Sequence, residues 1–122
     1  MCVDAQKLVE HLKELILDLR HSLAHEIESS KEEEKRTYRQ VYTVIAMIEY
    51  EADVIHLIVT RHCEVNNNLL AKLAIPRINM IFKFLAVAQE KLEDTKYNDL
   101  VKELNMQMLK FIRSLMEVGA SG

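Results

Sequence analysis

The chain has 122 residues, of which 49% are hydrophobic and 29% are charged, and its formal net charge is −3. This balance is that of a soluble globular protein and excludes a disordered chain. The length fits one domain, which we expect to span residues 1–122. The small negative charge gives no overall field that would favour nucleic acid, so a nucleic-acid partner is not expected from charge alone.

Glycine and proline are nearly absent from the body of the chain. Both glycines, Gly119 and Gly122, fall in the last four residues, and Pro76 is the single proline. These residues are the strongest punctuators of local structure, and a sheet protein would need several of them at its turns. The composition therefore predicts long helices.

The first predicted helix covers about residues 4–28. Asp4 can serve as its N-cap, since a side-chain oxygen there accepts from a free backbone N–H. Apolar residues then recur at steps of three and four, which is typical of one helical face. The expected core positions are Ala5, Leu8, Leu12, Leu15, Leu19 and Leu23, widened by Ile16 and Ile27.

A second helix is predicted over about residues 31–62. Ser30, with Glu33 three residues later, has the spacing of a capping box, which favours a tight turn at Ser29–Ser30 over one continuous rod. The β-branched run from Val54 to Thr60 could alternatively form a strand. The regular spacing favours a helix, with its stripe at Tyr38, Val41, Ile45, Ile48, Ala52, Ile55 and Val59.

A loop is expected at residues 66–68, which are three consecutive asparagines. The third predicted helix covers about residues 69–93. Pro76 either lies in the first turn of this helix, after a short turn over residues 69–75, or kinks a longer helix. Its stripe is expected at Leu70, Ala74, Ile78, Ile81, Leu85, Ala88 and Leu92.

The fourth predicted helix covers about residues 95–118, with a cap at Asp94–Thr95. Gly119 suits the position just past a helix end, and a disordered tail is expected at residues 119–122. Short links make neighbouring helices antiparallel, so the predicted fold is an all-α, up-down-up-down four-helix bundle. The stripe of the fourth helix is expected at Tyr97, Val101, Leu104, Met108, Phe111, Leu115 and Val118.

The expected location is the cytoplasm. The two cysteines, Cys2 and Cys63, cannot form the disulfide framework of a small secreted domain. The first residues lack a basic region followed by an apolar run, so no signal peptide is expected. No apolar stretch approaches the roughly 20 residues that span a bilayer, so no membrane association is expected.

The second and third helices carry more apolar residues than their stripes need. These residues predict a surface for self-association, in a homodimer or another homo-oligomer, or for a protein partner. The alternative is that one chain buries unusually wide helix faces. The candidate interface residues are Val44, Met47, Val54, Leu57, Ile58, Met80, Phe82, Phe84 and Val87.

Arg20 and His25 form an Arg-x4-His pattern that resembles the motif of the HEPN family. Those are small helical domains, many of which dimerise to form a metal-independent ribonuclease site. The resemblance implies that Arg20 binds phosphate and stabilises the transition state, while His25 acts as acid or base. His25–Glu26 is also similar to the phospho-accepting box of histidine kinases, which implies a phosphotransfer role.

A metal site is a further hypothesis, because helical bundles can bind metals through carboxylates and histidines on facing helices. Spacings of four and three put Glu49, Asp53 and His56 on one helical face. With a turn at Ser30, His11 would lie opposite Glu49. A solvated face with ion pairs explains the same residues, so no metal is expected. No cofactor is expected either, since no glycine-rich phosphate loop exists.

These observations favour a non-catalytic interaction or scaffold module that self-associates through an apolar surface on the second and third helices. The alternative function is a HEPN-like ribonuclease that uses Arg20 and His25 at a dimer interface.

Overall fold

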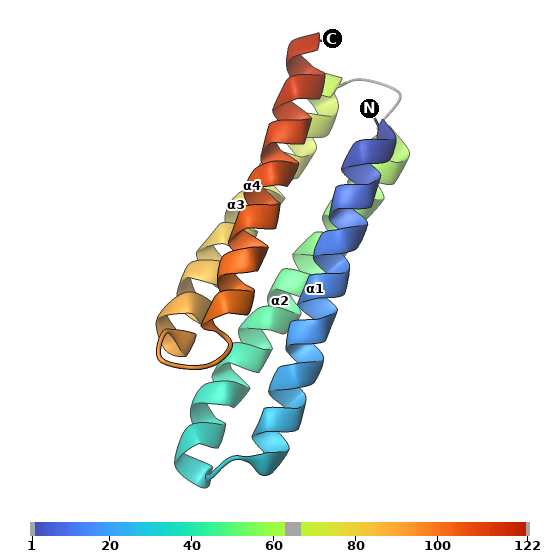
Figure 1. The fold of residues 1–122 in the computed structure, drawn as a ribbon. Helices are drawn as coiled ribbons and strands as arrows, with labels where there is room; N and C mark the ends of the chain where they lie inside the picture. The colour runs from blue at the N-terminus through green and yellow to red at the C-terminus, as the bar shows by residue number, and fades with distance from the viewer. Residues whose placement is uncertain (1, 63–66, 122) are drawn as a thin grey trace.

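The structure, a computed structural model, describes residues 2–62 and 67–121, with side chains at residues 5–61 and 69–115. All the regular secondary structure in these ranges is helical. The helices pack lengthwise against one another, which confirms the predicted all-α four-helix bundle (Figure 1). They are α1 (Cys2–Ser29), α2 (Glu32–His62), α3 (Asn67–Leu92) and α4 (Asn98–Ser121).

Each helix packs against two neighbours. α1 and α3 each contact both α2 and α4, so α1 and α3 lie at opposite corners of the bundle. Consecutive helices run antiparallel, and the α1–α2 turn projects beyond the α3–α4 turn at the same end (Figure 1). The predicted up-down-up-down order is therefore confirmed.

The α1–α2 turn forms where two serines precede three acids, which excludes one continuous rod. The backbone N–H of Ser30 donates to the carbonyl of Glu26 at 2.9 Å and closes the last turn of α1. The carbonyl of Lys31 then accepts from the N–H of Lys35 at 2.9 Å, which makes Lys31 the cap residue of α2. The predicted capping box of Ser30 and Glu33 is therefore wrong by one residue.

Several element boundaries differ from the predictions. α1 begins at Cys2, so Asp4 lies inside the helix and is not its N-cap. α3 begins at Asn67, so Asn67 and Asn68 are helical and not in a loop, while Asn66 lies outside the described residues. Residues 93–97 form a turn, so α4 begins at residue 98 and not at 95. α4 continues through Gly119 to residue 121, past its predicted end, which contradicts a disordered tail at 119–121; Gly122 lies outside the described residues.

Pro76 lies well inside α3, so the longer of the two predicted helices is correct. Proline has no backbone N–H, so the carbonyl of Lys72 loses its usual helical donor. The run from Val54 to Thr60 is helical, which excludes a strand there. Sustained apolar spacing has overridden two local signals against a helix.

The core confirms the predicted stripes of α2, α3 and α4 among the described side chains, except that Tyr38 is only half-buried. The stripe of α1 is partly wrong. Val9 and Ile16 are fully buried, whereas Leu8 and Leu15 are half-buried and pack against the edge of the core. Leu8 and Val9 are adjacent on one broad face, as are Leu15 and Ile16. The helix is rotated so that the second residue of each pair faces the core.

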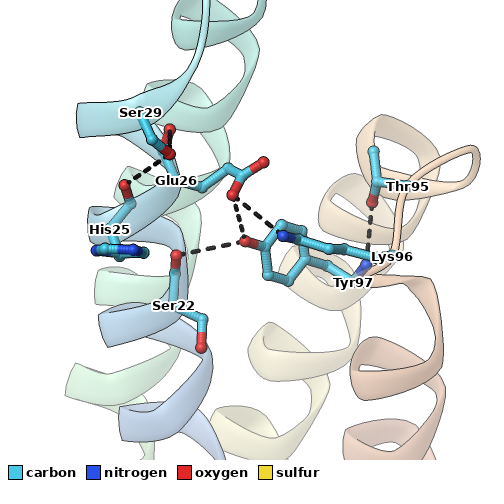
Figure 2. A network of polar contacts seen from close by, with 7 residues as sticks. All are labelled: Ser22, His25, Glu26, Ser29, Thr95, Lys96 and Tyr97. Atoms are coloured by element: carbon cyan, nitrogen blue, oxygen red, sulfur yellow. Dashed lines mark hydrogen bonds and ion pairs between the residues drawn. The ribbon is translucent and has the colours of Figure 1, made fainter.

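The turn before α4 is held by Thr95. Its hydroxyl donates to the carbonyl of Leu92 at 2.7 Å and accepts from the N–H of Tyr97 at 3.2 Å. This fixes the direction in which Tyr97 leaves the turn. Figure 2 shows the ring of Tyr97 reaching across to α1.

Tyr97, the last residue of the turn before α4, ties that turn to α1. Its hydroxyl lies 3.1 Å from Oε2 of Glu26 and 3.4 Å from the carbonyl oxygen of Ser22 (Figure 2). The ammonium of Lys96 lies 3.3 Å from the same carboxylate oxygen, and the ring meets that of Tyr38 edge-on at 6.0 Å. Burial, and then the hydrogen bond and charge of Glu26, raise the pKa of Tyr97 to about 12.

We predict that Tyr97→Phe lowers the free energy of unfolding by about 1 kcal/mol, the usual net value of one hydrogen bond. The raised pKa adds a pH effect. Below pH 10 the hydroxyl is protonated in both states, and between pH 10 and about 12 only the unfolded chain releases its proton. Wild-type stability should therefore fall in that window more steeply than that of Tyr97→Phe, as measured by urea unfolding. Equal slopes would contradict this account.

Candidate functional site

The groove between α1 and α2 is lined with charges that pair across it. Lys13 of α1 lies 3.2 Å from Oδ1 of Asp53 and 3.3 Å from Nδ1 of His56, both on α2. Nε2 of His56 lies 3.7 Å from a carboxylate oxygen of Glu10. The groove is therefore a ladder of complementary side chains that joins the two helices.

This ladder bears on the metal hypothesis. The ammonium of Lys13 lies between Asp53 and His56, where a bound cation would have to be. Glu49 is paired with an arginine, and His11 is exposed. Within residues 2–62 and 67–121, no three histidine, cysteine, aspartate or glutamate side chains are close enough to hold a metal ion. The structure does not bring the four candidate ligands together.

Arg20 belongs to the same groove. Its Nε lies 2.6 Å from Oε2 of Glu49, as an ion pair without an aligned hydrogen bond, and its Nη1 donates to the hydroxyl of Tyr42 at 3.2 Å. The hydrogen bond to Tyr42 is the main cause that raises the pKa of the guanidinium. Arg20 thus joins α1 to α2.

His25 lies on a different flank of α1. It is exposed, in a shallow groove that also contains Ser22, Lys96 and Tyr97, on the side of α4. The structure therefore separates Arg20 and His25 within one chain, although the two belong to the same motif. The ribonuclease hypothesis requires a second chain to bring them together.

The groove between α2 and α3 has a different character. Two contacts show which flanks meet there: Glu51 with Arg77, and Gln40 with Lys91. Residues three, four or seven positions from these lie on the same flanks. Tyr50 and Leu57, three residues after Met47 and Val54, extend the flank of α2 onto its outer face, where Tyr50 lines a hollow with Met47, Glu51 and Phe84. The resulting α2–α3 surface consists of Val44, Met47, Tyr50, Val54, Leu57 and Ile58 on α2, and Leu73, Met80, Phe84 and Val87 on α3.

The members of this surface fall into two groups. Val44, Ile58 and Phe84 are half-buried and pack against the core, and Val54 is also half-buried. The others remain open to solvent: Met47 is 44% exposed, Tyr50 63%, Leu57 52%, Leu73 38%, Met80 37% and Val87 40%.

The sequence-based set of interface residues needs one correction and two additions. Phe82 lies seven residues before Gln89, whose side chain meets Asn105 of α4, so Phe82 faces α4 and packs against the core there. Tyr50 and Leu73 were missed, although both follow the seven-residue spacing of predicted members, Leu57 and Met80. That spacing was the signal that could have found them.

An ion pair lies at the middle of the α2–α3 surface. Glu51 is only 8% exposed. The Nη1 atom of Arg77 donates to both of its carboxylate oxygens, at 3.1 and 3.3 Å. The amino-acid sequence alone does not reveal this pair, because its recognition requires the register between α2 and α3.

The expectation that only the second and third helices expose surplus apolar residues is also incomplete. On α4, Leu100, Met106 and Leu109 are exposed, and they lie among charged residues such as Lys102 and Lys110. Scattered single residues of this kind are normal on soluble proteins. α1 exposes one large apolar side chain among those described, Leu17.

Neither a family model, nor a curated protein, nor a solved structure matches the chain. Among the described helices, none combines the length and apolar character that a membrane span requires.

We predict that Arg20 has a structural role that His25 lacks. Arg20→Ala should lower the thermal unfolding midpoint, because it leaves Glu49 and Tyr42 without their partner across the groove. The matched control His25→Ala should change stability by no more than about 0.5 kcal/mol, as for an exposed side chain. Circular dichroism during heating measures both. Equal loss in the two variants would contradict the assignment.

Proposed function

We propose that the protein is a non-catalytic interaction module, acting in the cytoplasm, that self-associates through the α2–α3 surface. The proposal is supported by the distribution of exposed apolar side chains. α1 and α3 lie at opposite corners of the bundle, yet α3 exposes Leu73, Met80 and Val87 on the α2–α3 surface, where α1 exposes only Leu17 among the described residues.

The difference between α1 and α3 can be compared with the usual composition of a bundle helix. A helix on the outside of a bundle normally has one apolar stripe and a polar outer face. α1 follows this rule, and its flank toward α2 is a ladder of ion pairs. The stripe of α3 is already buried in the core, and Leu73, Met80 and Val87 beside it leave more than a third of their surface in contact with solvent. Covering them is the simplest physical reason for their presence.

The free energy gained by burying these side chains can be compared with the cost of association. Fully burying a large apolar side chain contributes roughly 1.5–3 kcal/mol, so a half-exposed one contributes on the order of 1 kcal/mol. Six such side chains on each of two chains give on the order of 10 kcal/mol, against a cost of about 4–15 kcal/mol for the freedom lost on association. Because gain and cost are of similar size, the expected oligomer is reversible and its population depends on concentration.

We predict that Met80→Glu shifts the protein from oligomer to monomer while the fold is retained. The matched control is Leu17→Glu. Both side chains are 37% exposed, and the substitution adds the same charge, but Leu17 lies on α1, outside the proposed surface. Light scattering over a concentration series should show a reduced mass for Met80→Glu alone, with unchanged helical circular dichroism in both variants.

Met80 is a better test position than Ile58 or Phe84, which pack against the core and would lose stability when made charged. A wild-type chain that stays monomeric at every concentration up to hundreds of micromolar would contradict the proposal. So would equal dissociation of the Met80 and Leu17 variants.

The ribonuclease alternative predicts a different result. RNA cleavage by the wild-type chain should disappear in His25→Ala, measured with a fluorescent single-stranded RNA. We expect no cleavage above that of the variant. A true activity that depends on His25 would overturn the non-catalytic proposal.

A further inference from the structure

The ion pair of Glu51 and Arg77 has a feature that one chain does not explain. A nearly buried carboxylate is costly unless it is well paired, and such pairs are retained most clearly where they specify a register. Both hydrogen bonds to Glu51 come from the Nη1 atom of Arg77. An arginine has five N–H donors. No described residue accepts from Nη2 or Nε, and the Arg77 side chain is 42% exposed.

The pair lies at the centre of an otherwise apolar surface. On α2 the surface runs from residue 44 to residue 58, and Glu51 is its midpoint. Any partner that covers the apolar side chains therefore also covers Arg77 and removes water from its free donors. That partner must offer an acceptor at this point, or the buried guanidinium is left unsatisfied.

A second copy of the chain can supply this acceptor in one of two symmetric arrangements. With the two-fold axis running across the helices, α2 lies on the partner's α2, so like charges face each other. With the axis parallel to the helices, along the α2–α3 groove, each α2 lies on the partner's α3 at the same level. Each Arg77 then faces the partner's Glu51, and unlike charges meet.

The size of the α2–α3 surface can be compared with that of a standard interface. Residues 44–58 of α2 span about 21 Å at 1.5 Å per residue. Two adjacent helices are about 20 Å wide at their usual separation. The projected area is thus roughly 400 Å² before side-chain corrugation is counted, about half of the roughly 800 Å² of accessible surface that each partner buries in a standard interface.

We infer that two copies associate about an axis parallel to their helices, and that Arg77 of each chain bridges its own Glu51 and the partner's Glu51. The α2 and α3 helices of both chains then form a four-helix arrangement at the centre of the dimer. In it each α2 is antiparallel to the partner's α3, as it is to its own α3. The inference rests on the proposed self-association and adds the residues that determine its geometry.

Complementation between two charge variants tests this arrangement. Glu51→Lys and Arg77→Glu each place like charges opposite each other in a homodimer, and each should dimerise at least about thirtyfold more weakly than the wild type. In an equimolar mixture, the introduced lysine of one chain faces the introduced glutamate of the other, and the native pair is kept at the second contact. The mixture should therefore form heterodimers with an affinity within about tenfold of the wild type.

The outcomes separate the two proposals. If the wild type is monomeric, both fail. If the wild type dimerises and Met80→Glu dissociates it, but the mixture does not recover, self-association stands and the inferred bridge is wrong. An ion pair that acts only within one chain predicts this second result, because mixing cannot repair two separately damaged chains.

A second measurement covers the case in which a charge variant fails to fold alone. Cys2 and Cys63 are replaced by serine, and one chain then carries Glu51→Cys while another carries Arg77→Cys. A short bis-maleimide linker should join the two chains when they are mixed. The matched control is His25→Cys in place of Arg77→Cys. Equal cross-linking of the control, or none with Arg77→Cys, would overturn the inference.

Discussion

Four stripes of apolar side chains meet along the axis of the bundle, and their spacing of three and four residues orients each helix. Residues such as Leu23, Val41, Ala88 and Val101 are fully buried. Once these positions face inward, the positions beside them must face a neighbouring helix, and the rest face water. The character of every groove and every outer surface therefore depends on how the core stripes are oriented.

The two grooves of α2 show this consequence. On one flank of α2, Glu49, Asp53 and His56 pair with charges from α1. On the other flank, apolar residues surround Glu51 and its arginine. A charged groove can remain wet without cost, because its side chains are satisfied by each other and by solvent. An apolar groove gains free energy when it is covered.

The sequence predicts long-range packing well where the apolar spacing is unbroken. The buried stripes of α2 and α3 could be predicted directly, because in a regular repeat only one set of apolar positions fits a single helical face. α1 has two phases, since Leu8 is followed by Val9 and Leu15 by Ile16, and only packing decides between them. Contacts between helices, such as those of Tyr97 with α1 or Glu51 with α3, depend on register, which local spacing does not contain.

The outer faces of α1 and α3, at opposite corners of the bundle, therefore differ in polarity. This difference limits the kinds of assembly that the chain can form. Exposed apolar residues on α3 favour association, whereas the charged flank and polar exterior of α1 disfavour it. Because the same surface on both copies is consumed, an association through α2 and α3 closes at two chains and leaves their α1 helices outside. The Glu51–Arg77 pair within that surface would fix the position of one chain along the other. Apolar contacts tolerate sliding, whereas Arg77 gains an acceptor only where the partner's carboxylate lies at its own level.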